Sequence, residues 1–413
     1  MKELAKNMRQ PELLAPAGDL EKLETALAYG ADAVYLGGEH FSLRALAGNF
    51  SLAQLARARD LVRTAGKRLY LTLNAYLRPD ESNGLAGYLE ELRLLDLDAY
   101  IVADPAVLAT VKRVDPGREI HLSTQANTTS GSAAEFWRGA GVKRVNLARE
   151  LTLDDIRAVR AGTSAELEVF VHGAQCVAYS GRCLLSAALA DRSANSGLCA
   201  QSCRWRYALQ EETRPGEFFS VEEDPRGSYI MNSRDLCLIE YLPQLADAGV
   251  DSFKIEGRMK SRYYVAAVTR VYRAALDCYL ADPTGYRYDP RWREELEKVS
   301  HRPYGDGFLA GTQDVQVHRS DSRYRRSHDF VGVVLSVGPD GRGTVEGRNR
   351  FFPDEELELI GPEMRQAFFP AGPLASEKGQ PMAVAQPNAR IVMALPAGAR
   401  PGDLLRREKL SGN

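Results

Sequence analysis

The sequence predicts an α/β fold, a closed (β/α)8 TIM-like barrel followed by a small C-terminal antiparallel β-barrel. Over roughly the first 280 of its 413 residues, eight short apolar segments alternate with helical patterns, as parallel strands wrapped by helices require. After residue 328 short strand-like segments follow one another between Pro, Gly and Asp turns. A doubly wound open sheet is the competing fold, but eight units without a Gly-rich phosphate loop favour the closed barrel.

The expected barrel strands are short and nearly continuous in hydrophobicity. They are Glu12–Ala15, Ala33–Gly37, Arg68–Asn74, Ala99–Asp104, Glu119–Gln125, Arg144–Glu150, Glu166–Gly173 and Ser252–Arg258. Between them, apolar residues recur at steps of three and four, which is typical of a helix packed against a sheet on one side. These helical patterns include Asp19–Tyr29, Leu52–Ala65, Gly84–Leu95 and Ser132–Gly139. Asp19, Ser51 and Thr152 stand where helices are expected to begin.

The C-terminal segments that read as strands are separated by turn residues. They are Phe330–Val337, Gly343–Gly347, Glu356–Ile360, Met382–Val384 and Arg390–Ala394. We therefore expect a barrel domain at 1–300, a linker at 301–328 and a β-barrel domain at 329–413.

The composition is that of an ordinary globular protein, with 44% apolar residues and a formal net charge of -2. A net charge this close to zero does not by itself indicate nucleic-acid binding, so RNA binding would need local basic patches. No apolar run reaches the roughly 20 residues of a membrane span, and the N-terminus lacks the apolar core of a signal peptide. Six cysteines without an export signal suggest reduced thiols or metal ligands. We expect a cytoplasmic protein that does not enter a membrane.

Polar residues stand at the ends of the expected strands. In a (β/α)8 barrel these ends meet at one mouth, where the chemistry takes place. The competing explanation is that several of them simply cap helices. Lys254 precedes two of them on the eighth strand, and together they resemble a set for holding an anion. The strand-end residues are Asp19, Asn74, Asp104, Gln125, Glu150, His172, Glu256 and Arg258.

Four cysteines fall in a long excursion between the seventh and eighth strands. They follow the spacing C-x6-C-x15-C-x3-C, at Cys176, Cys183, Cys199 and Cys203. Four thiolates suit zinc or an iron–sulfur cluster, and the spacing alone leaves both open. Unmetallated thiols are the third possibility. The excursion spans 174–233, and a helix is expected at Arg234–Ala248.

The remaining cysteines, Cys237 and Cys278, lie in helical patterns. Buried spectators are the expected role for both, because a free cysteine behaves as a small hydrophobe.

Several segments together resemble the collagenase-like peptidase family of unknown catalytic type, U32. The similarity lies in LAPAGD at 14–19, GADAVY at 30–35, EVFVHGAQCVAYSGRCLLS at 168–186, GLCAQSCRW at 197–205 and KIEGR at 254–258. It covers nearly the whole chain. Gln175 departs from the signature, which has an aliphatic residue there.

Within this family, MNSRD at 231–235 and HRPY at 301–304 are similar to the branch that makes 5-hydroxyuridine at the tRNA wobble position. The resemblance implies oxygen-independent hydroxylation, with tRNA as partner and prephenate or a similar carboxylate as hydroxyl donor. It also implies a [4Fe–4S] cluster on Cys176, Cys183, Cys199 and Cys203, with Cys237 as a reserve ligand.

On this hypothesis, the donor's carboxylates would be held by Lys254, Arg258 or Arg182, and His172, Glu256 and Glu150 are the candidates for proton transfer. Asn74 and Gln125 would line the same pocket.

RNA would need basic and aromatic side chains on one surface. Three segments mix them: RWRY at 204–207, which includes Arg204 and Trp205, RMKSRYY at 258–264 and HRSDSRYRR at 318–326. A solvated face with core aromatics is the alternative for each.

Two other functions compete with hydroxylation. A collagenase-like peptidase could use a cysteine with His172, although neither an H-E-x-x-H nor a G-x-S-x-G motif is present. A non-catalytic RNA-binding module with structural zinc is the third.

Overall fold

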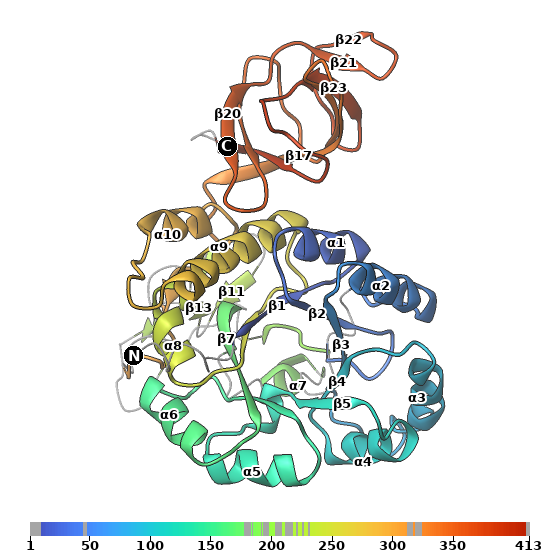
Figure 1. Cartoon of the computed structure of the whole chain (residues 1–413), viewed down its shortest axis with the longest axis vertical. Helices are drawn as coiled ribbons and strands as arrows, with labels where there is room; N and C mark the ends of the chain where they lie inside the picture. The colour runs from blue at the N-terminus through green and yellow to red at the C-terminus, as the bar shows by residue number, and fades with distance from the viewer. Residues whose placement is uncertain are drawn as a thin grey trace.

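The structure of this protein is a computed structural model, in which a barrel ringed by helices carries a smaller C-terminal β-unit (Figure 1). It describes residues 10–43, 48–176, 183, 185–190, 192, 198–202, 209–210, 218–219, 222–224, 227–229, 232–311, 317–318 and 324–409.

Eight parallel strands form the closed barrel that the sequence predicts. The last of them, β14, pairs with β1 on one side and β7 on the other, which closes the sheet. The strands are β1 (Glu12–Pro16), β2 (Ala33–Gly37), β3 (Arg68–Leu73), β4 (Ala99–Val102), β5 (Glu119–Leu122), β6 (Arg144–Asn146), β7 (Glu166–Ala174) and β14 (Ser252–Ile255).

Helices ring the strands (Figure 1). They are α1 (Leu20–Ala28), α2 (Leu52–Thr64), α3 (Leu85–Arg93), α4 (Pro105–Val114), α5 (Gly131–Gly139), α6 (Leu153–Ala161), α8 (Leu242–Asp247), α9 (Arg262–Ala281) and α10 (Pro290–Glu297). A further helix, α7 (Leu185–Ala190), belongs to the excursion between β7 and β14. The predicted starts are confirmed, since Asp19, Ser51 and Thr152 each accept a backbone N–H at the first turn.

Successive side chains along the barrel strands point alternately into two separate hydrophobic clusters. On β2, Tyr35 joins Leu14 and Tyr70 in a cluster separate from the large one, whereas its neighbours Val34 and Leu36 belong to the large cluster that also includes the helices' apolar residues. This period of two explains why the strands read as nearly continuous apolar runs, because both faces are covered.

Charged residues on four strands form a buried network. Lys254 Nζ lies 2.8 Å from Glu168 Oε1, and Arg144 Nη1 lies 2.5 Å from Glu12 Oε1 and 3.5 Å from Glu168 Oε2. Burial alone would raise the pKa of Glu168, but Lys254 and Arg144 outweigh it and lower that pKa. Lys254 is therefore held by Glu168 in the barrel wall, and its predicted contact with a donor carboxylate stays a prediction.

The excursion between β7 and β14 comes back to the barrel at a strand that pairs with the end of β7. The predicted helix at Arg234–Ala248 is wrong in its first half, because Asp235–Cys237 form β13, which pairs antiparallel with the end of β7. The helix α8 begins only at Leu242, after a 3-10 turn at Ile239–Tyr241. Residues 235–237 form a strand because backbone groups at the end of β7 pair with them, and this pairing outweighs their local preference for a helix. Short strands lie in or pair with the excursion: β8 (Leu209–Gln210), β9 (Phe218–Phe219), β10 (Glu222–Asp224), β11 (Gly227–Tyr229), β12 (Asn232–Ser233) and β16 (Val317–His318).

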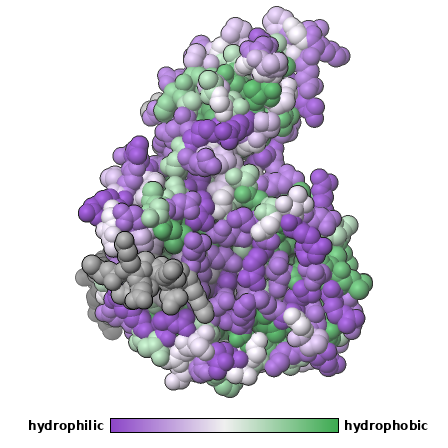
Figure 2. Space-filling view, in the orientation of Figure 1, coloured by the Kyte–Doolittle hydropathy of each residue, from purple (hydrophilic) through white to green (hydrophobic). Residues whose placement is uncertain are grey.

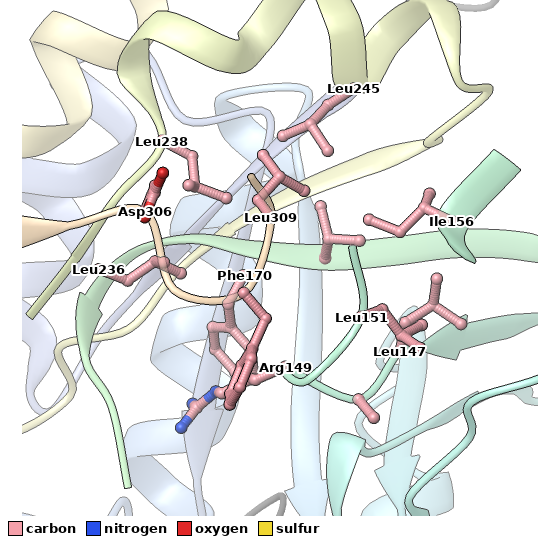
Figure 3. A pocket seen from close by; sticks show the side chains of 13 residues that line it. Leu147, Arg149, Leu151, Ile156, Phe170, Leu236, Leu238, Leu245, Asp306 and Leu309 are labelled. Carbon is pink, nitrogen blue, oxygen red and sulfur yellow. The ribbon is translucent and has the colours of Figure 1, made fainter. Parts of the chain in front are cut away.

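The returning segment packs against the outer face of β7 around a small cavity of about 30 Å³. Leu236, Leu238 and Leu245 meet Leu309 there, with Asp306 beside them (Figure 3). This volume holds about one water molecule. Strand β13 is therefore part of the barrel's packing rather than a loose loop end.

The C-terminal unit is one antiparallel sheet of eight strands, as the predicted β-rich pattern requires. Its own core includes Val331, Phe351 and Ile391. The sequence does not predict three of its strands, and the predicted strand Met382–Val384 overlaps β22 only at Met382. The strands are β17 (His328–Val337), β18 (Arg342–Gly347), β19 (Glu356–Ile360), β20 (Gln366–Pro370), β21 (Leu374–Ser376), β22 (Pro381–Met382), β23 (Arg390–Ala394) and β24 (Leu404–Glu408).

The two units meet through a buried ion network. Arg406 on β24 is fully buried, and its guanidinium contacts Glu295 on α10 and Glu358 on β19, each at 2.7 Å or less. Arg270 on α9 also pairs with Glu295. Because Val333 on β17 belongs to the barrel's hydrophobic cluster, the apolar core continues across this seam.

The predicted domain limits stay predictions. Within the predicted linker, Tyr304–Gly305 form β15, which pairs with β13. In the part of the chain that the structure describes, no helix combines the length and apolarity needed to cross a membrane.

Replacing Glu295 by Gln should weaken the seam. Burial alone would raise the pKa of Glu295, but Arg270 and Arg406 outweigh it and lower it to about 2. Removing one partner leaves two buried guanidinium groups undercompensated, and the free energy of unfolding should fall by about 3–5 kcal/mol. Urea unfolding followed by circular dichroism measures this.

The same substitution should change the pH dependence. The contribution of an ionised Glu295 is complete above its unfolded pKa of about 4.3 and is lost as pH falls toward the folded value. The wild-type protein should therefore lose more stability between about pH 4.5 and 2 than Glu295→Gln does. Glu294→Gln on the exposed side of α10 is the control and should stay within about 0.5 kcal/mol of wild type. Equal stabilities of all three proteins would contradict this assignment.

Candidate functional site

Polar side chains from β3 and β5 meet at the barrel mouth. Asn74 Nδ2 donates to Gln125 Oε1 at 3.1 Å and lies 3.4 Å from Ser123 Oγ. Tyr76 closes the group by donating its hydroxyl to the Gln125 carbonyl at 2.8 Å. Both predicted pocket residues, Asn74 and Gln125, are half-buried. The structure thus brings them together, although they are far apart in the sequence.

Arg258 lies at the same end of the barrel, just after β14. It is only 4% exposed, and its Nη1 donates to Ser42 Oγ at 3.1 Å and to Thr72 Oγ1 at 2.7 Å. A Cβ added at Gly37 would lie 2.4 Å from the same nitrogen. The guanidinium is therefore seated against bare backbone at the end of β2 and is held by two hydroxyl groups.

Glu256 directly follows β14, two residues before Arg258. The Tyr35 hydroxyl donates to the Ile255 carbonyl at 3.0 Å and lies 3.2 Å from Glu256 Oε2. Tyr264 donates to the Glu256 carbonyl at 2.9 Å. The half-buried carboxyl group thus has a defined position at the mouth, as the sequence predicts.

Other predicted strand-end residues have different surroundings. Asp19 and Asp104 cap α1 and α4, so the capping explanation is correct for both. Glu150 lies half-buried in the turn after β6.

His172 lies in the wall of the barrel rather than at its open mouth. It is fully buried, and the hydroxyls of Tyr272 and Tyr304 lie 3.3 Å and 3.4 Å from its two ring nitrogens. Burial lowers the pKa of His172 to about 3, so the ring is neutral at pH 7. These contacts favour a structural role, and its predicted proton transfer stays a prediction.

Cys237 is the cross-strand neighbour of His172. Its sulfur lies 3.9 Å from the Tyr272 hydroxyl, and burial raises the pKa of the thiol. A nucleophilic cysteine needs the opposite shift and access to solvent. Cys237 is buried, as predicted, and its role as a spectator stays a prediction. The prediction of burial is wrong for Cys278, which is exposed on α9.

The structure describes three of the four predicted cluster ligands. Cys176 and Cys183 are half-buried, and Cys199 is exposed. Cys199 Sγ accepts the backbone N–H of Gln201 at 3.4 Å, the kind of contact that supports a thiolate. By donor chemistry these thiols fit an iron–sulfur cluster. Cys203, Arg182, Arg204 and Trp205 lie outside the described residues.

No three His, Cys, Asp or Glu side chains among the described residues come close enough to hold a metal ion. The ligand set therefore stays a prediction.

The three predicted RNA-binding segments also differ. The segment 204–207 lies outside the described residues. In 258–264, Tyr263 and Tyr264 are buried in the core, so these aromatic rings are not available for base stacking. The alternative of core aromatics is correct for this segment.

The segment 318–326 ends in an exposed basic and aromatic surface. Tyr324, Arg325 and Arg326 are exposed, and Lys260 Nζ lies 4.4 Å from the centre of the Tyr324 ring. Arg325 and Arg326 line a groove of about 460 Å³, whose other lining residues are Glu297, His301, Pro303, Tyr304 and Ser327. Hydrophilic residues dominate the face of the barrel seen in Figure 2. The two arginines are the groups in this groove that suit a polyanion, and Glu297 opposes them.

Sequence reasoning missed the hydroxyl groups that hold Arg258. Ser42 lies in the loop after β2, and Thr72 lies on β3, where an apolar run conceals it. The signal that could have found Thr72 is the period of two along β3, which points Arg68, Tyr70 and Thr72 to the barrel interior.

Comparison with known proteins gives two family matches. Residues 18–319 match the profile of peptidase family U32, and residues 326–406 match the C-terminal domain of the same family.

Three relatives carry different names. The tRNA hydroxylation protein P1 of Bacillus subtilis is 38% identical over 97% of this chain and 96% of the relative. The 23S rRNA 5-hydroxycytidine C2501 synthase of Escherichia coli is 38% identical over 80% of this chain and 49% of the relative. A collagenase of Porphyromonas gingivalis is 34% identical over 79% of this chain and 80% of the relative. With both of its units matched, the chain belongs to peptidase family U32.

Proposed function

We propose that this protein is an RNA-modifying enzyme that hydroxylates the wobble uridine of tRNA to 5-hydroxyuridine. The observation that carries the proposal is the 38% identity, along 97% of the chain, to a protein named for tRNA hydroxylation. The rRNA relative named as a 5-hydroxycytidine synthase supports the same type of reaction on another pyrimidine. A cytoplasmic location fits this substrate.

The reaction replaces hydrogen at C5 of uridine by hydroxyl, which removes two electrons from the base. In the proposed exchange, the donor's C–O bond breaks and a C5–O bond forms. The donor takes up the hydrogen and the two electrons, so no molecular oxygen is needed. Prephenate, or another small carboxylate that carries a hydroxyl group, is the proposed donor.

The mouth residues supply binding for such a donor. Arg258 brings a guanidinium to the mouth, where Ser42 and Thr72 orient it. A guanidinium can pair with a carboxylate through two parallel hydrogen bonds. Asn74 and Gln125 can donate to and accept from the uracil edge or the donor. Because the target atom lies within a stacked anticodon, the base would leave its stack to reach the mouth.

Proton transfer at the mouth is assigned to a carboxylate. Glu256 lies beside the Tyr35 hydroxyl and close to Arg258 in the chain, so it is the first candidate to hold the C5 proton. Glu150 is the second. His172 is the weakest of the three predicted candidates, because burial keeps it neutral and away from solvent.

Cys176, Cys183, Cys199 and Cys203 are the proposed ligands of a [4Fe–4S] cluster. When bound, such a cluster supplies a Lewis-acidic or redox-active iron. Cys176 follows the end of β7 by two residues, which supports its proposed role as the first ligand. Cys237 is a poor substitute ligand, since it is buried beside Tyr272.

A peptidase is the alternative that the family name and the collagenase relative suggest. Its most plausible dyad among the described residues is Cys237 with His172. The raised pKa of this thiol and the lowered pKa of this imidazole are both opposite to what a thiolate–imidazolium pair needs. We therefore prefer RNA hydroxylation.

The cluster and the reaction can be tested together. Protein purified without oxygen should be brown and should carry about four iron and four sulfide per chain. tRNA from a deletion strain should lack 5-hydroxyuridine derivatives by mass spectrometry, and the wild-type gene should restore them. A Cys183→Ala gene should not restore them, whereas Cys278→Ala on the surface of α9 is the control and should.

Colourless protein with stoichiometric zinc would contradict the cluster, and unchanged tRNA would contradict the reaction. Normal tRNA binding by Cys183→Ala, without any modification defect in the deletion strain, would instead support a non-catalytic RNA-binding module.

The groove at the domain junction should contribute to tRNA binding. Replacing Arg325 and Arg326 by Ala removes two exposed cations from it. The dissociation constant for tRNA should rise roughly tenfold. The slope of the logarithm of the binding constant against the logarithm of salt concentration should become less steep by about one to two, because fewer counterions are released on binding. Filter binding at several salt concentrations measures both. Arg342→Ala, exposed on β18, is the control and should bind as wild type does; an unchanged double variant would exclude the groove.

The seat of Arg258 can be tested through Gly37. The Cβ of Gly37→Ala would lie 2.9 Å from Arg258 Cζ, so the guanidinium must move. The variant should lose about 1–3 kcal/mol of stability and should restore tRNA hydroxylation at less than about a tenth of the wild-type level.

Gly87→Ala is the matched control for this substitution. It lies on the exposed side of α3 with no atom within 4 Å of the added Cβ, so it should be neutral or more stable by up to about 1 kcal/mol. Full activity of Gly37→Ala would remove Arg258 from the proposed donor site.

A further inference from the structure

Both ends of the cysteine-bearing excursion are fastened at one buried ion pair, Asp235 with Arg302. We propose that this pair, called the clasp, positions Cys176 at the end of β7 and fastens both ends of the excursion there, and thereby governs retention of the cluster. Asp235 and Arg302 are positioning residues in this proposal. It rests on the proposed function, and its test separates the two.

The clasp is geometrically complete. Arg302 Nε lies 2.9 Å from Asp235 Oδ1, Nη2 lies 2.8 Å from the same oxygen, and the Arg302 backbone N–H donates to Oδ2 at 3.2 Å. The two residues are 2% exposed or less. A buried carboxylate is tolerated only when such partners replace its water.

The same guanidinium reaches the outgoing end of the excursion. Arg302 Nη2 donates to the carbonyl oxygen of Gln175 at 3.4 Å, and Gln175 is the residue before Cys176. Gln175 is 6% exposed, and a Cβ added at Gly307 would lie 2.8 Å from its Nε2. The residue that departs from the family signature is thus packed and held at its backbone.

The incoming end is held at the same place by backbone pairing. Asp235 lies opposite Ala174 in the β7–β13 ladder, and its N–H donates to the Pro303 carbonyl at 3.1 Å. Asp235 also lies opposite Tyr304 in the pairing with β15. One residue therefore joins the end of β7, the end of the excursion and the segment that leads to the C-terminal unit.

A second cation links the clasp to the mouth. Lys260, two residues after Arg258, has its Nζ 4.0 Å from Asp235 Oδ2. Burial alone would raise the pKa of Asp235, but Arg302 and Lys260 outweigh it and lower that pKa.

Closure of the barrel does not depend on the clasp, since β14 pairs with β1 and β7 through its own ladders. Loss of the clasp should therefore release the excursion while the barrel stays folded. Bringing the two ends of such a long segment together has an entropic cost, which the clasp offsets.

The test compares Asp235→Asn and Arg302→Lys with wild type in the full-length chain. In metal-free protein, hydrogen exchange of peptides covering 171–176 and 234–238 should become at least tenfold faster in Asp235→Asn, with β1 to β4 unchanged. Arg302→Lys keeps the positive charge but loses the guanidinium's paired N–H donors, so hydrogen exchange should accelerate less than in Asp235→Asn. If Asp235→Asn does not fold, Arg302→Lys decides the outcome.

The second readout is iron and sulfide per chain after anaerobic purification, which should fall at least threefold in Asp235→Asn. Glu295→Gln is the control: it breaks a comparably buried ion pair at the seam, and both readouts should stay at wild-type values.

Wild-type exchange at both excursion ends, or wild-type iron retention in Asp235→Asn, would overturn the proposal. If the wild-type chain itself takes up no iron, the proposed cluster fails, and positioning of a cluster by the clasp fails with it. Hydrogen exchange then still decides whether the clasp holds the excursion.

Discussion

Strand β14 has to pair with two strands at once, and the site depends on this constraint. It lies between β1, the first strand, and β7, which precedes a long excursion. Arg258 and Glu256 follow β14 directly, so they reach the mouth only when the sheet closes. The excursion can vary widely in length and content, because the barrel needs only that its two ends return to the edge of β7.

Buried charges hold together segments that are distant in the sequence. Lys254 and Glu168 connect two barrel strands, Asp235 and Arg302 connect the excursion to β15, and Arg406 connects β24 to α10. An ion pair inside a protein adds little net stability compared with apolar packing, but an unpaired buried charge is costly. Such pairs therefore select one arrangement of the segments over others. In this molecule the buried ion pairs join segments whose apolar patterns alone do not specify which segment pairs with which.

Most of the barrel could be predicted from the sequence because its signals are local. Apolar runs bounded by Gly and by capping residues such as Ser51 specify strands and helices without knowledge of distant contacts. Three C-terminal strands were missed because they are short and contain Pro or polar residues, as in Gln366–Pro370. Their pairing partners, rather than their own residues, make them strands.

The candidate site was predictable in part for the same reason. Asn74, Gln125, Glu256 and Arg258 stand at strand ends, and the barrel geometry alone brings such ends together. His172 was expected at the mouth, but the register shift between β7 and β14 falls beside it, and it lies in a tyrosine-lined pocket in the wall. A register shift of this kind leaves no trace in hydrophobic periodicity. The roles of Ser42 and Thr72 depend on a contact with Arg258 that only the folded chain reveals.

The contacts between the two units determine when the barrel can complete its packing during synthesis of the chain. Tyr29, at the end of α1, donates its hydroxyl to the carbonyl oxygens of Ile360 and Gly402. Helix α1 therefore gains these two hydrogen-bonding partners only after Ile360 and Gly402 have been synthesised. Until then the surface that α1 and α9 present to the C-terminal sheet stays uncovered. Final consolidation of this barrel accordingly waits for the C-terminal sheet, even though each of its strands could pair while the chain is growing.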